Sequence, residues 1–163
     1  MRWMVLALLT GCAELEEPVD ATEPAVDVPN ICINELQPDN ETTLEVDGDF
    51  PDWVELHNPT DEEVLLDQWS ISESRSPDVW LLGLVLPAGG YLVLTADEDL
   101  PGADLPFNLD SDGQDLQLID PYGGGRRVEW SHIRGDNSAA RLTNCCQGDC
   151  WEVTEQPSPG TPN

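Results

Sequence analysis

The chain has 163 residues, enough for one domain with a hydrophobic core and short extensions. It carries 33 acidic residues against six arginines and no lysine, a formal net charge of −27 at pH 7. Such a field repels phosphates and argues against nucleic acid as a partner, while six tryptophans and 39% hydrophobic residues argue against general disorder.

The first twelve residues predict export. Arg2 precedes an apolar run too short to span a bilayer, so residues 1–11 are predicted to be a signal peptide. Leu-Thr-Gly-Cys at residues 9–12 resembles the lipobox of bacterial lipoproteins. This resemblance implies cleavage before Cys12, a diacylglycerol on its sulfur and, because Ala13 follows, an outer-membrane location. The alternative is an ordinary signal peptide in which Cys12 is incidental, but small residues directly before the cysteine favour lipidation.

Residues 12–29 are predicted to form an acidic, proline-rich tether. The segment after Cys12 contains six acidic residues, three prolines and no basic residue. Proline and like charges favour extended backbone, so the tether could hold a domain up to ~50 Å from the membrane at ~3.1 Å per residue. Its composition alone is that of an acidic linker without a specific partner.

The rest of the chain, residues 30–163, is predicted to be one domain of short strands. Apolar and β-branched stretches between turn residues predict strands at residues 31–36, 52–57, 64–66, 69–71, 79–85, 91–96, 107–109, 114–120 and 128–132. Further short strands are expected within residues 138–163. Strands of this length, separated by turns every 8–12 residues and without a helical period, predict an all-β sandwich of antiparallel strands.

Two glycine-containing segments are predicted to be turns. Asp-Ser-Asp-Gly at residues 110–113 begins like a calcium loop, but no glutamate follows at the twelfth position and no helices flank it. Its Asp-Gly pair predicts a hairpin turn instead. The three glycines at residues 123–125 also predict a hairpin turn, followed by two exposed arginines, Arg126 and Arg127.

The ordered motifs of the domain resemble those of the lamin tail domain family. Order and spacing agree across residues 31–163, through Ile-Asn-Glu at 33–35, Asp-Trp-Val-Glu-Leu-His-Asn at 52–58, and residues 64–69, 86–94, 107–109, 113–120, 138–141 and 158–163. The resemblance implies an immunoglobulin-like β-sandwich that acts as a binding or structural module rather than as an enzyme. The chain departs from the family at residues 144–151, where three cysteines occupy the usual short turn before a tryptophan.

The resemblance also limits the function to be expected. In nuclear lamins the domain mediates interactions with proteins and DNA, and in bacteria it occurs in secreted and surface proteins, often joined to hydrolase domains. No hydrolase motif is recognisable here, and neither His57 nor His132 adjoins a nucleophile motif. We therefore expect a non-catalytic envelope lipoprotein that binds a protein or a glycan, or has a structural role, without a cofactor.

Four cysteines remain for the domain if Cys12 is lipidated. Of the three possible pairings of Cys32, Cys145, Cys146 and Cys150, the one that joins the adjacent cysteines is strained. Cys32 is therefore expected to pair with Cys145 or Cys146, and the remaining one with Cys150. Four thiolates also suit zinc, but paired Cys-x2-Cys knuckles are absent and an exported chain is in an oxidising compartment, which favours disulfides.

Two glutamates lie among apolar strand residues. Glu35 falls on the same predicted face as Ile31 and Ile33, and Glu55 lies within the strand at residues 52–57. An unpaired buried charge is costly, so the hypothesis is that Arg141 pairs with Glu55 or Glu35 inside the sandwich. The alternative is that both glutamates point outward.

One acidic cluster offers oxygen ligands for calcium. Glu45, Asp47, Asp49 and Asp52 lie within eight residues, and calcium takes six to eight oxygens from a flexible loop. In so acidic a chain such clusters arise by chance, so a solvated loop is the simpler interpretation. The alternative function is accordingly a calcium-dependent surface binding or adhesion module.

Overall fold

The computed structural model describes residues 28–73, 77–146, 148 and 150–163. In chain order this part contains the strands Cys32–Gln37 (β1), Asp52–His57 (β2), Val64–Leu65 (β3), Ser70–Glu73 (β4), Val79–Trp80 (β5), Val85–Leu86 (β6), Tyr91–Ala96 (β7), Gln114–Ile119 (β8), Gly125–Trp130 (β9), Ser138–Arg141 (β10) and Trp151–Thr154 (β11). The described residues include no helix with the length and apolar character needed to cross a membrane.

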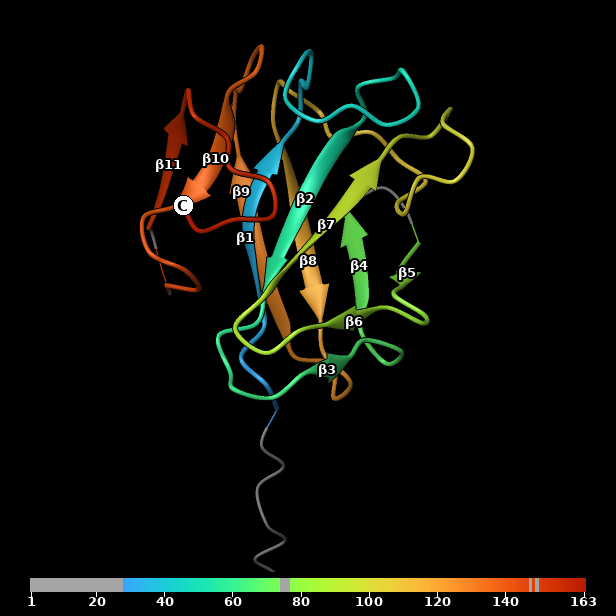
Figure 1. The fold of residues 1–163 in the computed structure, drawn as a ribbon, viewed down its shortest axis with the longest axis vertical. Helices are drawn as coiled ribbons and strands as arrows, with labels where there is room; N and C mark the ends of the chain where they lie inside the picture. Colours follow the sequence, from blue (N-terminus) through green and yellow to red (C-terminus); the bar gives the residue numbers. More distant parts are fainter. Residues whose placement is uncertain (1–27, 74–76, 147, 149) are drawn as a thin grey trace, which may run out of the picture.

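The strands form two main sheets that pack face to face (Figure 1). One has five strands in the order β11-β10-β1-β2-β7, and the other has four in the order β5-β4-β8-β9. The short strands β3 and β6 pair with each other at one end. Every pairing of these strands is antiparallel, so the predicted all-β sandwich of antiparallel strands is confirmed.

The hydrophobic core lies between the two sheets, as strand periodicity requires. In β2, Val54 and Leu56 point inward and are 0% exposed, and Leu94 of β7 is equally buried beside them. Leu116 and Leu118 of β8 close the core from the opposite sheet. Each such side chain stabilises the fold by about 1.5–3 kcal/mol relative to its exposed state.

A β-bulge in β1 changes which residues face the core. The register between β1 and β2 shifts between Ile33 and Glu35, so that Ile33 and Leu36 both pack in the core. Glu35 instead pairs directly opposite Glu55, on the outer face of the five-stranded sheet. The prediction that Glu35 shares a face with Ile33 is therefore wrong.

Two of the predicted strands and one predicted hairpin differ from the structure in kind, beyond small shifts of the strand ends. The predicted strand at residues 79–85 is split by a turn in which Gly83 has φ 74°, giving β5 and β6. Residues 107–109 form no strand, although Phe107 and Leu109 pack in the core. The Asp-Gly turn, closed by the Gly113 N–H to Asp110 carbonyl bond of 3.0 Å, therefore precedes β8 but joins no hairpin.

The two ends of the sandwich carry different parts of the chain (Figure 1). The first described residues enter at the end that carries β3, β6 and the turn between β8 and β9. The loops at residues 38–51 and 97–113 lie at the opposite end. Residues 155–163, here called the C-terminal segment, pass over the outer face of the five-stranded sheet and contact β1 and β2 there.

Candidate functional site

The outer face of the five-stranded sheet buries two carboxyl groups beneath the C-terminal segment. Glu35 and Glu55 are both 0% exposed. The Ser158 backbone N–H and hydroxyl donate to Glu35, the hydroxyl over 2.9 Å, and the Ser138 hydroxyl also donates to it. The Gly160 N–H donates to Glu55 Oε2 over 2.7 Å. The C-terminal segment thus supplies hydrogen bonds to both glutamates.

Burial disfavours the charged form of both carboxyls. It raises the pKa of Glu55 to about 7, although hydrogen bonds from Asn34 and Gly160 lower it, and the charge of Glu35 adds to the rise. Burial likewise raises the pKa of Glu35 against hydrogen bonds from Ser138 and Ser158. Two carboxyls placed directly opposite each other repel when both are ionised, so this face is most stable when at least one is protonated.

Arg141 forms no ion pair with either glutamate, so that hypothesis is wrong. Its Nε donates to the Ile33 carbonyl over 2.7 Å, its Nη1 donates to the Cys146 carbonyl, and its guanidinium lies 4.5 Å from the Trp151 ring centroid. The reason is the alternation of β10, in which Ala139 packs in the core and Arg141 follows two residues later on the same side. The glutamates point outward from that sheet, as the alternative had it, but they are buried beneath the C-terminal segment.

The four cysteines of the domain form two disulfides. Cys32 is bonded to Cys145, with their Cα atoms 5.4 Å apart, and Cys146 is bonded to Cys150. Of the two pairings expected from sequence, the structure has the one that joins β1 to the first of the two adjacent cysteines. Because all four are bonded to sulfur, no thiolate is left among them for zinc. Cys12 lies outside the described residues.

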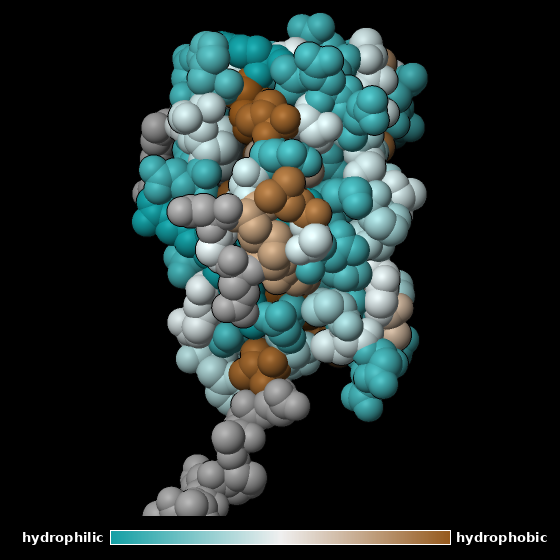
Figure 2. Space-filling model, turned by 90° about the vertical axis from the view of Figure 1, so that its left-hand side faces the viewer, coloured by the Kyte–Doolittle hydropathy of each residue, from teal (hydrophilic) through white to brown (hydrophobic). Residues whose placement is uncertain are grey.

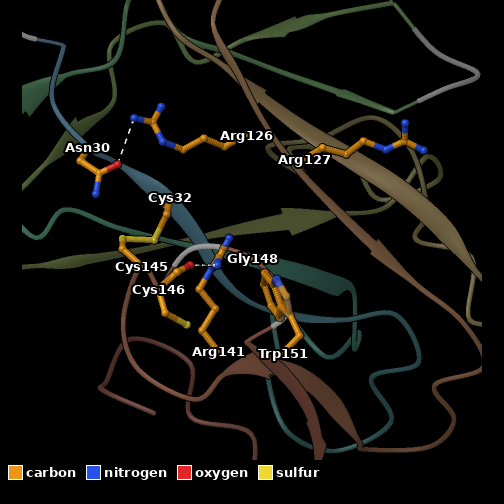
Figure 3. Close-up of a pocket in the computed structure, with 9 residues that line it drawn as sticks. All are labelled: Asn30, Cys32, Arg126, Arg127, Arg141, Cys145, Cys146, Gly148 and Trp151. Carbon is orange, nitrogen blue, oxygen red and sulfur yellow. Dashed lines mark hydrogen bonds between the residues drawn. A yellow bond between two sulfur atoms is a disulfide. The ribbon is translucent and has the colours of Figure 1, made fainter.

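Beside these disulfides, a cavity of about 390 Å³ opens at the end of the sandwich where the chain enters. Three of the chain's six arginines line it: Arg126 and Arg127 from β9, and Arg141 from β10 (Figure 3). Arg126 alternates along β9 with the core residues Val128 and Trp130, so its side chain is directed toward the facing sheet. It is half-buried, not exposed as predicted.

Arg126 and Arg141 have neutral partners. Arg126 Nη2 donates to the Asn30 side-chain oxygen over 3.1 Å, and Arg141 donates to backbone carbonyls. Within the part of the chain that the structure describes, neither forms an ion pair with a carboxylate, and burial lowers the pKa of Arg141. Arg127 differs, because its guanidinium lies 3.4 Å from Asp115.

The side of the sandwich between the edge strands β9 and β11 contains this cavity and a second one. Figure 2 shows this face as largely hydrophilic, with separate apolar spots. The second cavity, of about 280 Å³, adjoins the first at Trp151, which lines both. Glu129 and Glu152 line the second cavity, whereas the first is lined by arginines.

The calcium candidates are not drawn together into a site. Asp47 and Asp49 belong to a tight exposed turn closed by two backbone bonds between Val46 and Asp49, and Glu45 is exposed beside it. The carboxylate of Asp52 accepts from the Leu109 N–H over 2.9 Å. In the described ranges no group of three or more histidine, cysteine, aspartate or glutamate side chains is placed to hold a metal ion. Calcium binding stays a prediction, which calorimetry with calcium, with and without a chelator, would test.

The sheet order, the core and the buried outer-face carboxyls define a module with an immunoglobulin-like β-sandwich fold. A family model described as Lamin Tail Domain matches residues 24–139, and the chain belongs to this family. Comparison with curated proteins found no match. The family match ends before Arg141, before the three clustered cysteines and before the C-terminal segment.

Proposed function

We propose that this chain is a non-catalytic envelope lipoprotein that presents its lamin tail domain as a binding or structural module. Cys12 carries the lipid anchor in the outer membrane. The tether at residues 12–29 connects this anchor to the domain. The partner is an envelope or extracellular protein or glycan, and not a nucleic acid. The observation that carries the proposal is the Leu-Thr-Gly-Cys sequence at residues 9–12, placed directly before an acidic tether and a β-sandwich.

The position at which the chain enters the sandwich supports presentation away from a membrane. The first described residues lie at one end, and the loops at residues 38–51 and 97–113 lie at the other (Figure 1). A lipid at Cys12 would therefore leave the far end and both sides of the sandwich accessible to a partner. The two disulfides also support export, because such bonds form and persist in oxidising compartments.

The placement of the shifted carboxyls supports a binding role over a catalytic one. Catalytic acids and bases with shifted pKa values lie in clefts that a substrate can enter. Glu35 and Glu55 instead lie beneath the C-terminal segment, where their oxygens accept hydrogen bonds from Ser158 and Gly160. His57 is likewise engaged, because its ring stacks on Tyr91 with centroids 4.4 Å apart and its Nδ1 contacts the Gly90 carbonyl.

Replacing Cys12 by serine tests the anchor. In a bacterial host fed an alkyne fatty acid, the parent chain is expected to incorporate the label and to fractionate with the outer membrane. Cys12→Ser is expected to lose the label and the membrane association, because a diacylglycerol with a further acyl chain gives stable anchoring. Gel analysis of labelled membrane and soluble fractions measures both.

The double variant Cys146→Ala/Cys150→Ala is a matched control, since it also removes cysteines but leaves the lipobox intact. It should stay labelled and membrane-bound. Equal labelling of Cys12→Ser and the parent would contradict lipid attachment at Cys12. Release of the unlabelled parent into the soluble fraction would identify residues 1–11 as an ordinary signal peptide.

A further inference from the structure

The arginine-lined cavity gathers positive charge in a chain that is otherwise strongly acidic. The chain has 33 acidic residues for six arginines, so an arginine with no carboxylate partner is unexpected on composition alone. Arg126 and Arg141 are two such arginines among the described residues, and they line the same cavity. A buried guanidinium without a counter-ion is costly, since burial penalises its charge.

The orientation of Arg141 leaves hydrogen-bond donors for a ligand. The side chain is 7% exposed, and its Nε and Nη1 are held by the Ile33 and Cys146 carbonyls while its face lies over Trp151. No described residue accepts a hydrogen bond from its Nη2, although a guanidinium has five N–H donors. The guanidinium is thus fixed in place with donors still available at the cavity.

Arg126 contributes the second positive charge from the facing sheet. Its Nη2 is held by Asn30, whose side-chain oxygen is neutral. In Figure 3 the Arg126 side chain extends toward Asn30, whereas the Arg127 side chain extends away from the other residues drawn. The two arginines that face the cavity therefore come from strands of different sheets, β9 and β10.

We propose that this cavity binds a phosphate or sulfate group of a small ligand. A tetrahedral anion can accept hydrogen bonds from guanidinium groups that approach from different directions, and such charge-assisted bonds are the strong ones. A volume of about 390 Å³ also leaves room for a larger molecule that carries the group. Among the described residues that line the cavity, three are arginines and none is acidic.

This inference rests on the proposed binding role and specifies the ligand class. The experiment uses the full-length chain, purified in neutral detergent with its disulfides intact, at constant ionic strength. Inorganic phosphate, inorganic sulfate and glucose 6-phosphate are titrated by calorimetry and by NMR of the arginine Nε–H and tryptophan indole signals. Saturable binding is expected, with shifts at Arg141 and Trp151. Equal affinity for the three identifies the free anion as sufficient, and tighter binding of glucose 6-phosphate identifies a phosphorylated sugar.

One arginine that lines the cavity and one that lies outside it provide the test and its control. Arg126→Gln is expected to weaken phosphate binding about tenfold, because it removes one of the two facing charges. Arg134→Gln makes the same change of net charge at an exposed arginine that pairs with Asp112 and does not line the cavity, and it is expected to leave the affinity unchanged. Arg126→Lys keeps the charge and should recover part of the affinity, which separates a ligand contact from a folding defect.

Two outcomes would overturn the proposal. One is the absence of saturable binding for all three compounds. The other is equal weakening by Arg126→Gln and Arg134→Gln, which would indicate diffuse attraction to surface charge. Either outcome leaves the lipid-anchored module standing, because labelling at Cys12 is measured independently.

Discussion

Replacing Cys32 and Cys145 together by alanine is expected to lower the free energy of unfolding by about 4–5 kcal/mol. The bond joins residues 113 apart, and the chain-entropy model gives the largest stabilisation to such long closed loops. It also ties the first residue of β1 to the loop after β10. A loss of this size corresponds to a fall in Tm of about 10–20 °C for a domain of this length. Urea denaturation of the parent and the double variant measures it, with equal m-values as a check on the reference state.

The second disulfide provides a matched control. Cys146 and Cys150 are four residues apart, so Cys146→Ala/Cys150→Ala is expected to cost only about 2 kcal/mol in the same model. Equal destabilisation by the two double variants would contradict loop entropy as the cause. Non-reducing peptide mapping checks the connectivity directly, and a peptide that links Cys32 to Cys146 would show that the structure has the wrong partner.

The cysteines show how far sequence reasoning reaches. Their number and the exported context favoured two disulfides, but Cys145 and Cys146 are adjacent, so spacing could not distinguish their partners. The structure separates them through the backbone. Cys145 has a φ of 52°, in the left-handed region that non-glycine residues rarely adopt, and its sulfur is bonded to Cys32 in β1. Sequence alone carried no signal for that conformation.

Fold class was predictable because strand periodicity and turn residues agree along most of the chain. The strands at residues 52–57 and 91–96 match β2 and β7 within the sheet, and alternate residues such as Val54, Leu56 and Leu94 face the core. Where prediction was wrong, a local backbone feature overrode composition. Gly83 turns the chain inside an apolar stretch, and residues 107–109 enter the core without a strand partner.

Glu55 alternates with the core residues Val54 and Leu56 and so faces away from Arg141, while the proposed pairing with Glu35 was wrong because of one extra residue. Without the bulge in β1, Glu35 would share the face of Ile33, and Arg141 on the core side of β10 would be its neighbour. The bulge moves Glu35 to the outer face, since a shift of one residue changes the side of every later side chain. The same alternation, applied to β9, would have distinguished Arg126 from Arg127. That signal was present in the sequence, in the apolar residues Val128 and Trp130.

The partners of the buried glutamates could not be predicted from sequence. Residues 155–163 are rich in proline and polar residues and have no strand periodicity, so nothing in them indicates contact with β1 and β2. Ser158 lies 123 residues from Glu35, and Gly160 lies 105 residues from Glu55. Only the folded structure shows that the end of the chain supplies their hydrogen bonds.

The free energy of unfolding is expected to fall as pH rises from about 5 to 8. The pKa of Glu55 is about 7 in the folded chain and 4.5 in the unfolded chain, so the folded state holds more protons between these values and loses stability as pH increases. This carboxyl contributes at most about 3 kcal/mol.

The pKa of Asp52, raised by burial to about 6 from 3.8, acts in the same direction. His57, whose pKa is lowered by burial, opposes the trend below about 6.5, because the unfolded chain then takes up its proton. Urea denaturation at four pH values between 5 and 8 measures the slope.

Glu55→Gln isolates the contribution of that carboxyl. In the parent chain Asn34 Nδ2 donates to Glu55 Oε1 over 3.0 Å, and Asn34 Oδ1 has no hydrogen-bond partner in the described part of the chain. If the Asn34 amide turns over, the Gln amide can donate to Asn34 Oδ1 while the Gln oxygen accepts from the Gly160 N–H. The variant is therefore expected to be about 1–2 kcal/mol more stable than the parent at pH 8 and to show a smaller slope with pH. Glu152→Gln, which changes an exposed glutamate of β11, should leave the slope as it is. Identical slopes for the parent and Glu55→Gln would contradict a raised pKa of the Glu55 carboxyl. Glu35 and Glu55 would then both be charged and solvated beneath the C-terminal segment.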